Sequence, residues 1–240
     1  RPAVLGVLGA NTAIFALWQL ARRGGGSCRL SRALNAHTLC SLPHLRSGFV
    51  HTLLTSTASH QAPLHFAANT FGLFVFGMLA AESLSPGELG TLVAACGTSA
   101  TACHVFCHPW NPVLGASGAL MGLLVADGAL APWRRFQMIL PVPGLTFSML
   151  QVTDLVLAVN FAGFFLLRRW FGSIAWAAHL GGTAAGLGFV LGARVQGDPR
   201  FGDLWRMHEE RCAQEWWRTA DSMNDGVARA LDAAQRWRDS

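Results

Sequence analysis

Ser117 and His179 are the residues of this sequence best suited to hydrolytic chemistry. Ser117 lies in the segment GASG at 115–118, and His179 lies in AHLGG at 178–182. A serine hydroxyl attacks a carbonyl when a neighbouring base takes its proton, and histidine is the natural base near neutral pH. The pair therefore predicts acyl transfer through a serine nucleophile, provided that the fold brings the two side chains together.

Two more polar residues could stabilise the negative charge that develops in such a reaction. His65 and Asn69 are four residues apart, so on a helix they face the same direction. One donor aimed at an oxyanion contributes roughly 3 kcal/mol. Ser117 also follows Pro109 and Pro112, near an expected helix N-terminus with free backbone N–H groups. Alone, His65 would be an ordinary buried polar group, but its spacing to Asn69 favours a functional role.

No acidic residue accompanies His179 closely in the sequence. Asp127 lies ten residues after Ser117, which is roughly 15 Å along a helix, so we expect a Ser–His dyad and not a triad through Asp127. Asp127 and Asp154 also lack the Gly-x-Gly-Asp context of an intramembrane aspartyl protease. The His-Glu-x-x-His motif of zinc proteases is absent.

A group of cysteines and histidines invites a metal-binding interpretation. Cys103 and His104 are followed four residues later by Cys107 and His108, so each pair would share one helical face. The Cys-x-x-Cys spacing of structural zinc sites is missing. We therefore expect small buried thiols and an interfacial histidine pair, with no metal.

Glycine ridges would let the helices that carry Ser117 and His179 approach closely. Small residues at four-residue spacing allow the backbones of membrane helices to touch. The glycines that we expect to provide this close helix packing are Gly115, Gly118, Gly122, Gly182 and Gly186.

The composition places these residues in a membrane protein. Of the 240 residues, 52% are hydrophobic and 13% are charged, against about 25% charged in a typical soluble domain. The mean hydropathy is +0.35. The net charge of +5 is not gathered into a basic stripe, which excludes a nucleic-acid-binding module, and the apolar content excludes a disordered chain.

Six apolar segments approach the length of about 20 residues that crosses a bilayer. They run over 3–21, 63–81, 89–107, 115–131, 145–167 and 174–193. We expect residues 24–47 to be a loop and Pro141–Gly144 to be a turn; a broken transporter helix at Pro141–Gly144 is the less simple alternative. The arginines in alternate loops do not decide the orientation.

The predicted fold class is an all-α polytopic membrane helical bundle with two parts. Residues 1–193 form the six-span core. Residues 194–240 hold 17 of the 31 charged residues and have helical periodicity, which predicts a charged, soluble, helical tail. The chain begins with Arg1 and not with Met, so we expect an upstream segment, with any targeting peptide or additional span, to be missing.

Three motifs together resemble one known family. The patterns His65-x-x-x-Asn69, GASG at 115–118 and AHLGGTAAG at 178–186 occur in that order on separate predicted spans. This combination resembles the rhomboid family of intramembrane serine proteases over about residues 3–193. Within that family it is most similar to the mitochondrial presenilin-associated rhomboid-like subgroup.

The resemblance implies a function and a role for each site residue. Ser117 would be the nucleophile, His179 the general base, and His65 and Asn69 with the Ser117 N–H the oxyanion hole. It implies a water-filled cavity open to one membrane face, and it implies no metal or cofactor. The expected partners are the lipid bilayer and single-pass membrane-protein substrates, with no nucleic acid. The expected location is the mitochondrial inner membrane; a secretory-pathway or plastid membrane is the alternative.

Two positions depart from the family pattern. Met121 stands four residues after Ser117, where many rhomboids have a tyrosine against the catalytic histidine. The Trp-Arg pair common in the first loop of bacterial members is not evident in residues 24–47. The alternative function is a catalytically inactive rhomboid-like adaptor or binding protein, which the presence of both Ser117 and His179 disfavours.

Overall fold

The computed structural model describes residues 1–24, 28–137, 146–167, 174–201, 210 and 214. Its main helices are α1 (Pro2–Arg23), α5 (Pro63–Ala80), α6 (Pro86–Cys107), α7 (Ser117–Leu130), α8 (Met149–Ala162) and α9 (Trp176–Val195). Its shorter elements are α2 (Arg29–Thr38), α3 (Leu42–Arg46), α4 (Thr52–Thr55), a 3-10 turn (Ser56–Ala58), β1 (Arg135–Gln137), β2 (Thr146–Ser148) and a π-helical segment (Gly163–Leu167). The described chain is therefore mostly helical, as the sequence predicts.

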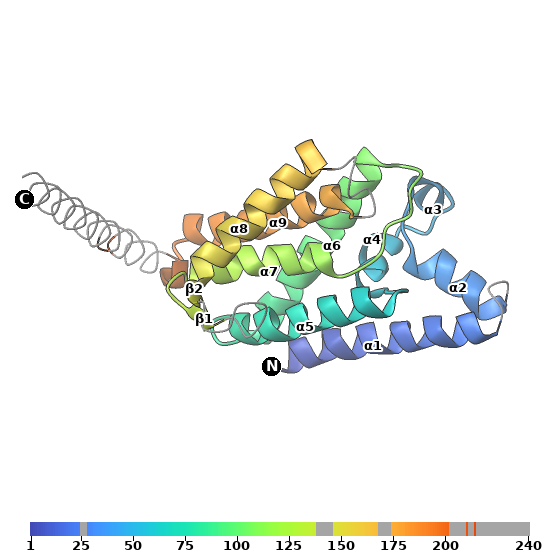
Figure 1. Ribbon diagram of the computed structural model, residues 1–240, viewed down its shortest axis with the longest axis horizontal. Helices are drawn as coiled ribbons and strands as arrows, with labels where there is room; N and C mark the ends of the chain where they lie inside the picture. The colour runs from blue at the N-terminus through green and yellow to red at the C-terminus, as the bar shows by residue number, and fades with distance from the viewer. Residues whose placement is uncertain (25–27, 138–145, 168–173, 202–209, 211–213, 215–240) are drawn as a thin grey trace, which may run out of the picture.

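The helix α7 lies at the centre of the bundle (Figure 1). In the view of Figure 1, α5 separates α7 from α1, and α8 lies on the other side of α7. The helices α6 and α9 pack against α7 and against each other. Leu73 of α5, Leu92 of α6 and Leu123 of α7 are buried in one hydrophobic cluster among these helices. The helix that begins with Ser117 is thus enclosed by its neighbours.

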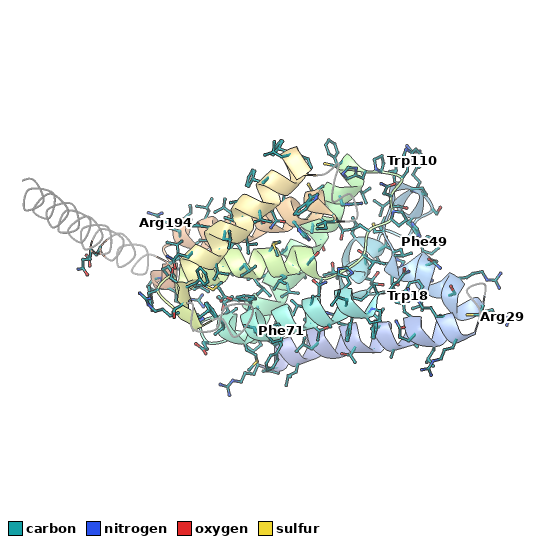
Figure 2. All side chains as sticks on the ribbon, in the orientation of Figure 1. Trp18, Arg29, Phe49, Phe71, Trp110 and Arg194 are labelled. Carbon is teal, nitrogen blue, oxygen red and sulfur yellow. The ribbon has the colours of Figure 1, made fainter. Side chains whose placement is uncertain are left out.

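Each of the six predicted apolar segments corresponds to a helix. Within the described residues, four helical stretches are long and apolar enough to cross a membrane: α1, α5, α6 and Met149–Leu166, which joins α8 to the π-helical segment. The helix α7 is apolar but shorter. Large apolar side chains stay exposed on the bundle surface; Phe71 of α5 (Figure 2) is 70% exposed. Exposed apolar surface of this kind suits a lipid environment.

The prediction of a loop over residues 24–47 is wrong, because α2 and α3 lie within it. The helix α2 begins at Arg29, where the Cys28 Sγ atom accepts a hydrogen bond from the Ser31 N–H. Its buried face consists of Ser31, Leu34 and Thr38, at spacings of three and four residues. A stripe with a single leucine is easily hidden among serines and arginines, so the polar composition concealed a packed helix.

The described part of the chain also contains two short strands, which the all-α prediction did not include. Strand β1 pairs antiparallel with β2, and Phe136 lies opposite Phe147 in the register. Residues 146–148, assigned to a span by the sequence, form β2, and α8 begins only at Met149 with a Ser148–Gln151 capping box. The predicted turn at Pro141–Gly144 and the predicted tail beyond Phe201, apart from positions 210 and 214, lie outside the described residues.

Candidate active site

Ser117 and His179 lie within hydrogen-bond distance of each other. The Ser117 Oγ atom is 2.9 Å from the His179 Nε2 atom. Ser117 is the first residue of α7, and His179 lies in the first turn of α9. The helix starts therefore bring together two residues that are 62 positions apart in the sequence.

The glycine ridges set this distance, because α7 and α9 touch through their backbones. A Cβ atom built on Gly182 would lie 1.9 Å from the Gly118 carbonyl oxygen, and one on Gly186 would lie 2.6 Å from the Gly122 carbonyl oxygen. A Cβ atom on Gly118 would also meet the Cβ atom of Ala100 on α6. Only glycine allows three helices to approach this closely at the level of Ser117.

The segment before Ser117 is held by residues that lie between α2 and α5. Cys40, just after α2, exchanges two backbone hydrogen bonds with Val113. The Gly115 N–H donates to the Ser56 carbonyl at 2.9 Å, and the Ala116 N–H donates to the His60 Nε2 atom at 3.2 Å. These contacts fix the direction in which the chain enters α7.

Position 115 requires glycine for a local reason. Its φ of +115° is a backbone conformation that other residues rarely adopt, and a Cβ atom there would lie 2.7 Å from the His65 Cε1 atom. The His65 ring therefore lies directly beside the residue that precedes Ala116 and Ser117. Of the five predicted packing glycines, Gly115 thus acts in the turn and the other four act between helices.

A cavity of about 890 Å³ opens beside the Ser–His pair. Its lining includes His65, Asn69, Ser117, Leu120, Trp176 and His179. The Asn69 amide donates one hydrogen bond to the His65 carbonyl at 2.9 Å, which leaves a second amide N–H for another acceptor. Because α7 begins at Ser117, its first backbone N–H groups have no acceptor within the helix. Donors from α5 and α7 thus border the space next to the Ser117 hydroxyl.

The remaining polar candidates lie apart from the Ser–His contact. His104 and His108 line the same cavity from the end of α6, but no three histidines, cysteines or acids cluster for a metal within the described ranges. Asp127 is buried in α7 away from the cavity, and Asp154 is exposed on α8. Among the described residues that line the cavity, none is acidic.

Charged side chains gather at the other end of the bundle. Trp110, in the loop that leads to Ser117, and Arg194, in the last turn of α9, mark the two ends in Figure 2. At the Arg194 end, Arg200 binds Asp198 at 2.6 Å and also binds Glu88. The Arg200 guanidinium lowers the pKa of the Asp198 carboxyl below its ordinary value. This cluster joins the start of α6 to the segment after α9, far from Ser117.

Two residues that contact the His179 ring, Asn160 and Trp176, were not predicted from the sequence. The Asn160 Oδ1 atom on α8 lies 2.6 Å from the His179 Nδ1 atom. The Trp176 ring meets the His179 ring edge to face, with centroids 6.0 Å apart. A signal for Asn160 was present, because an amide within an apolar span is costly without a partner. Nothing in its spacing to His179 identified that partner.

Comparisons with known proteins identify rhomboid relatives of this chain. The model of the Rhomboid domain matches residues 47–194. The chain is 29% identical over 197 residues to the human "Presenilin-associated rhomboid-like protein, mitochondrial", covering 78% of this chain and 47% of the relative. It is 32% identical over 195 residues to "Rhomboid protein 1, mitochondrial" of Saccharomyces cerevisiae, covering 77% and 51%.

A plant relative extends the same similarity. The chain is 26% identical over 204 residues to "RHOMBOID-like protein 12, mitochondrial" of Arabidopsis thaliana, covering 77% of this chain and 56% of the relative. The chain thus spans about half the length of the curated relatives it matches. The family model covers most of the membrane bundle, including Ser117 and His179. On these grounds the chain belongs to the rhomboid family.

Proposed function

We propose that the chain is an intramembrane serine endopeptidase that hydrolyses peptide bonds in or near the transmembrane segments of membrane proteins. The observation that carries the proposal is the 2.9 Å contact between Ser117 and His179 beside a cavity of about 890 Å³. Membership of the rhomboid family supports the same activity. The substrates that best suit a cavity between membrane helices are single-pass membrane proteins.

The first half of the reaction forms an acyl-enzyme. The His179 Nε2 atom takes the hydroxyl proton while the Ser117 Oγ atom attacks the carbonyl carbon of the scissile peptide bond. The carbonyl oxygen becomes negatively charged and is stabilised by His65, the Asn69 amide and the Ser117 backbone N–H. The protonated His179 then gives its proton to the departing amine as the C–N bond breaks.

The second half releases the acyl group. A water molecule from the cavity gives a proton to the His179 Nε2 atom and attacks the ester carbonyl carbon. The Ser117–acyl bond breaks, and the proton on His179 returns to the Ser117 oxygen. The products are the two pieces of the cleaved chain, and the reaction consumes one water without a metal or cofactor.

The membrane in which this chemistry occurs follows from the relatives. Several of them carry mitochondrial names, and this chain has helices of membrane-spanning length. The chain is accordingly an integral membrane protein of mitochondria. Placement in the inner membrane follows by resemblance.

The proposal is tested with the Ser117→Ala variant in proteoliposomes that hold a single-pass substrate. We expect cleavage to fall to background, a loss of up to about 10⁶-fold when a serine nucleophile is removed, together with loss of labelling by a fluorophosphonate probe. Ser99→Ala is the matched control, because it removes another hydroxyl between helices, bonded to the Gly181 carbonyl at 2.9 Å. Undiminished cleavage by Ser117→Ala, or a wild type that neither cleaves nor labels, would favour the inactive adaptor.

A further inference from the structure

The orientation of the Asn160 side-chain amide is set by its own hydrogen bonds. Its Nδ2 atom donates to the Val156 carbonyl at 2.7 Å and to the Met121 Sδ atom at 3.3 Å. Both partners are acceptors, so the nitrogen must lie on their side of the amide. The oxygen therefore faces His179, where the Oδ1–Nδ1 distance is 2.6 Å.

This orientation decides which nitrogen of His179 carries the proton. Because the Asn160 Oδ1 atom can only accept, the His179 Nδ1 atom must be the donor. In the neutral ring the Nε2 atom then keeps its lone pair, and it faces the Ser117 hydroxyl at 2.9 Å. A general base for serine needs this tautomer, since the opposite one would present an N–H to the hydroxyl.

We propose that Asn160 is a positioning residue for His179, so that the site is a hydrogen-bonded Ser117–His179–Asn160 triad in place of the predicted dyad. The inference rests on the proposed protease function and deepens it. The amide keeps the proton on Nδ1, holds the ring plane toward Ser117 and stabilises the imidazolium that forms when Nε2 takes the serine proton. Asn160 itself exchanges no proton during the reaction.

The burial of Asn160 and the packing around His179 support this role. Asn160 is 4% exposed, so an unmet amide there would be costly, and its hydrogen bonds join α8, α7 and α9. The π-helical segment after α8 begins at Gly163, where a Cβ atom would lie 2.2 Å from the Trp176 ring. Gly163 thus makes room for Trp176, which packs edge to face against the His179 ring.

Met121 gains an explanation from the same contact. The position four residues after Ser117 does not offer a phenol to His179 here. Its sulfur accepts the Asn160 amide hydrogen bond instead and so helps to turn the amide oxygen toward the ring. Positioning of His179 is thereby provided by Asn160, with Met121 acting through it.

The described surroundings of His179 contain no negatively charged side chain in the cavity. The titratable side chains that share the cavity with His179 are His65 on α5 and His104 and His108 at the end of α6. The partner of His179 on α8 is the neutral amide of Asn160. None of the described cavity residues is acidic. A carboxylate at position 160 would therefore add a negative charge that the native site lacks.

The test compares Asn160→Leu, Asn160→Asp and Thr153→Val in proteoliposomes, with kcat and KM measured across pH. Asn160→Leu should lower kcat by about 10- to 100-fold, the range for a hydrogen bond to a charged group, while KM changes little. Asn160→Asp should recover much of this loss. It should also move the acid limb of the pH profile to higher pH, because a carboxylate favours the imidazolium and raises the apparent pKa of the base.

Thr153→Val is the control for a purely structural effect. Thr153 is buried on the same helix and joins α8 to α7 through the Leu124 carbonyl at 3.1 Å, without touching His179. The control should leave kcat and the pH profile unchanged. An Asn160→Leu variant with native kcat, a Thr153→Val variant with an equal loss, or an Asn160→Asp profile with an unmoved acid limb would overturn the inference.

The tautomer can be read without any substrate. In ¹⁵N-histidine-labelled protein, NMR should report a protonated Nδ1 and an unprotonated Nε2 on His179, assigned by loss of the signal in His179→Gln. Asn160→Leu should allow the other tautomer to appear. If wild type shows the expected tautomer but cleaves nothing, the protease proposal fails and the positioning role stands. If wild type cleaves the substrate but the His179 tautomer is the same in wild type and in Asn160→Leu, only this inference fails.

Discussion

Substitution of Gly182 by alanine is the sharpest test of how the site is held together. The added methyl group would lie 1.9 Å from the Gly118 carbonyl oxygen and 2.6 Å from the Gly118 carbonyl carbon. Both atoms belong to the α7 backbone, so no side-chain rotation can relieve the clash. The helices α7 and α9 must therefore separate or slide at the point where they cross.

The required movement can be compared with the tolerance of the reaction. Ordinary van der Waals contact begins at 3.4 Å, so the local displacement is about 1.5 Å, and a misplacement of 1 Å can cost about 100-fold in rate. Gly182 lies three residues after His179, and Gly118 lies next to Ser117, so little of the displacement can be absorbed before it reaches the pair. We expect kcat/KM to fall by about 100-fold or more, with a loss of stability of about 1–3 kcal/mol.

Gly188→Ala is the matched control on the same helix. No atom lies within 4 Å of a Cβ built on Gly188, and alanine is favoured over glycine in a helix by about 1 kcal/mol. Cleavage of a single-pass substrate in liposomes and thermal unfolding followed by tryptophan fluorescence would be measured for both variants. Gly188→Ala should match the wild type in rate and have an equal or higher Tm.

Two outcomes would refute the reasoning about Gly182. One is a Gly182→Ala rate within about threefold of wild type, which would mean that the Ser117–His179 contact does not depend on the α7–α9 approach. The other is an equal loss in Gly188→Ala, which would indicate a general intolerance of α9 to substitution and no specific role for the ridge.

Two further predictions concern residues outside the Ser–His contact. Burial, with a smaller contribution from His65, lowers the pKa of His60 from 6.5 to about 4. Between these two pH values the unfolded chain therefore binds more protons than the folded chain. The free energy of unfolding should fall as the pH drops from 6.5 toward 4, by at most about 1.4 kcal/mol per pH unit. His60→Leu should lose this pH dependence. Because the variant has no acceptor for the Ala116 N–H, it should also be less stable and cleave substrate more slowly at pH 7. Unfolding measured across pH tests this, and an unchanged dependence of stability on pH would count against it. Arg200→Gln should lower the free energy of unfolding by about 1 kcal/mol or less, because its ion pairs are partly exposed; kcat should stay unchanged, and a large loss of kcat would contradict the separation of the charged end from the site.

The sequence predicted the main helices well because their signal is local. An apolar run bounded by proline, glycine or arginine is visible without knowledge of the fold, and each of the six runs became a helix. Residues 24–47 were misassigned because α2 is identified by what it packs against. Backbone contacts between distant segments, such as Cys40 with Val113, have no signature in side-chain type.

The candidate site was likewise predicted from the sequence only in part. The polar residues of the short motifs, Ser117, His179, His65 and Asn69, all line one cavity, and the glycine spacing predicted a close approach of two helices. Asn160 could not be assigned from spacing, because its link to His179 crosses from α8 to α9. The position of α8 depends on tertiary packing and on a π-helical segment that no local pattern in the sequence indicated.

The two ring nitrogens of His179 therefore depend on different parts of the fold. The Nε2 contact with Ser117 is fixed by the backbone approach of α7 and α9, in which side chains hardly take part. The Nδ1 contact comes from a single amide on α8, a helix that packs less extensively on this core than α7 and α9 pack on each other. Substitutions in the glycine ridge should thus change the approach of α7 and α9, whereas substitutions at Asn160 should alter the protonation and ring orientation of His179 while that approach stays unchanged. The separate responses of the unfolding temperature and of the pH profile would distinguish these two kinds of damage.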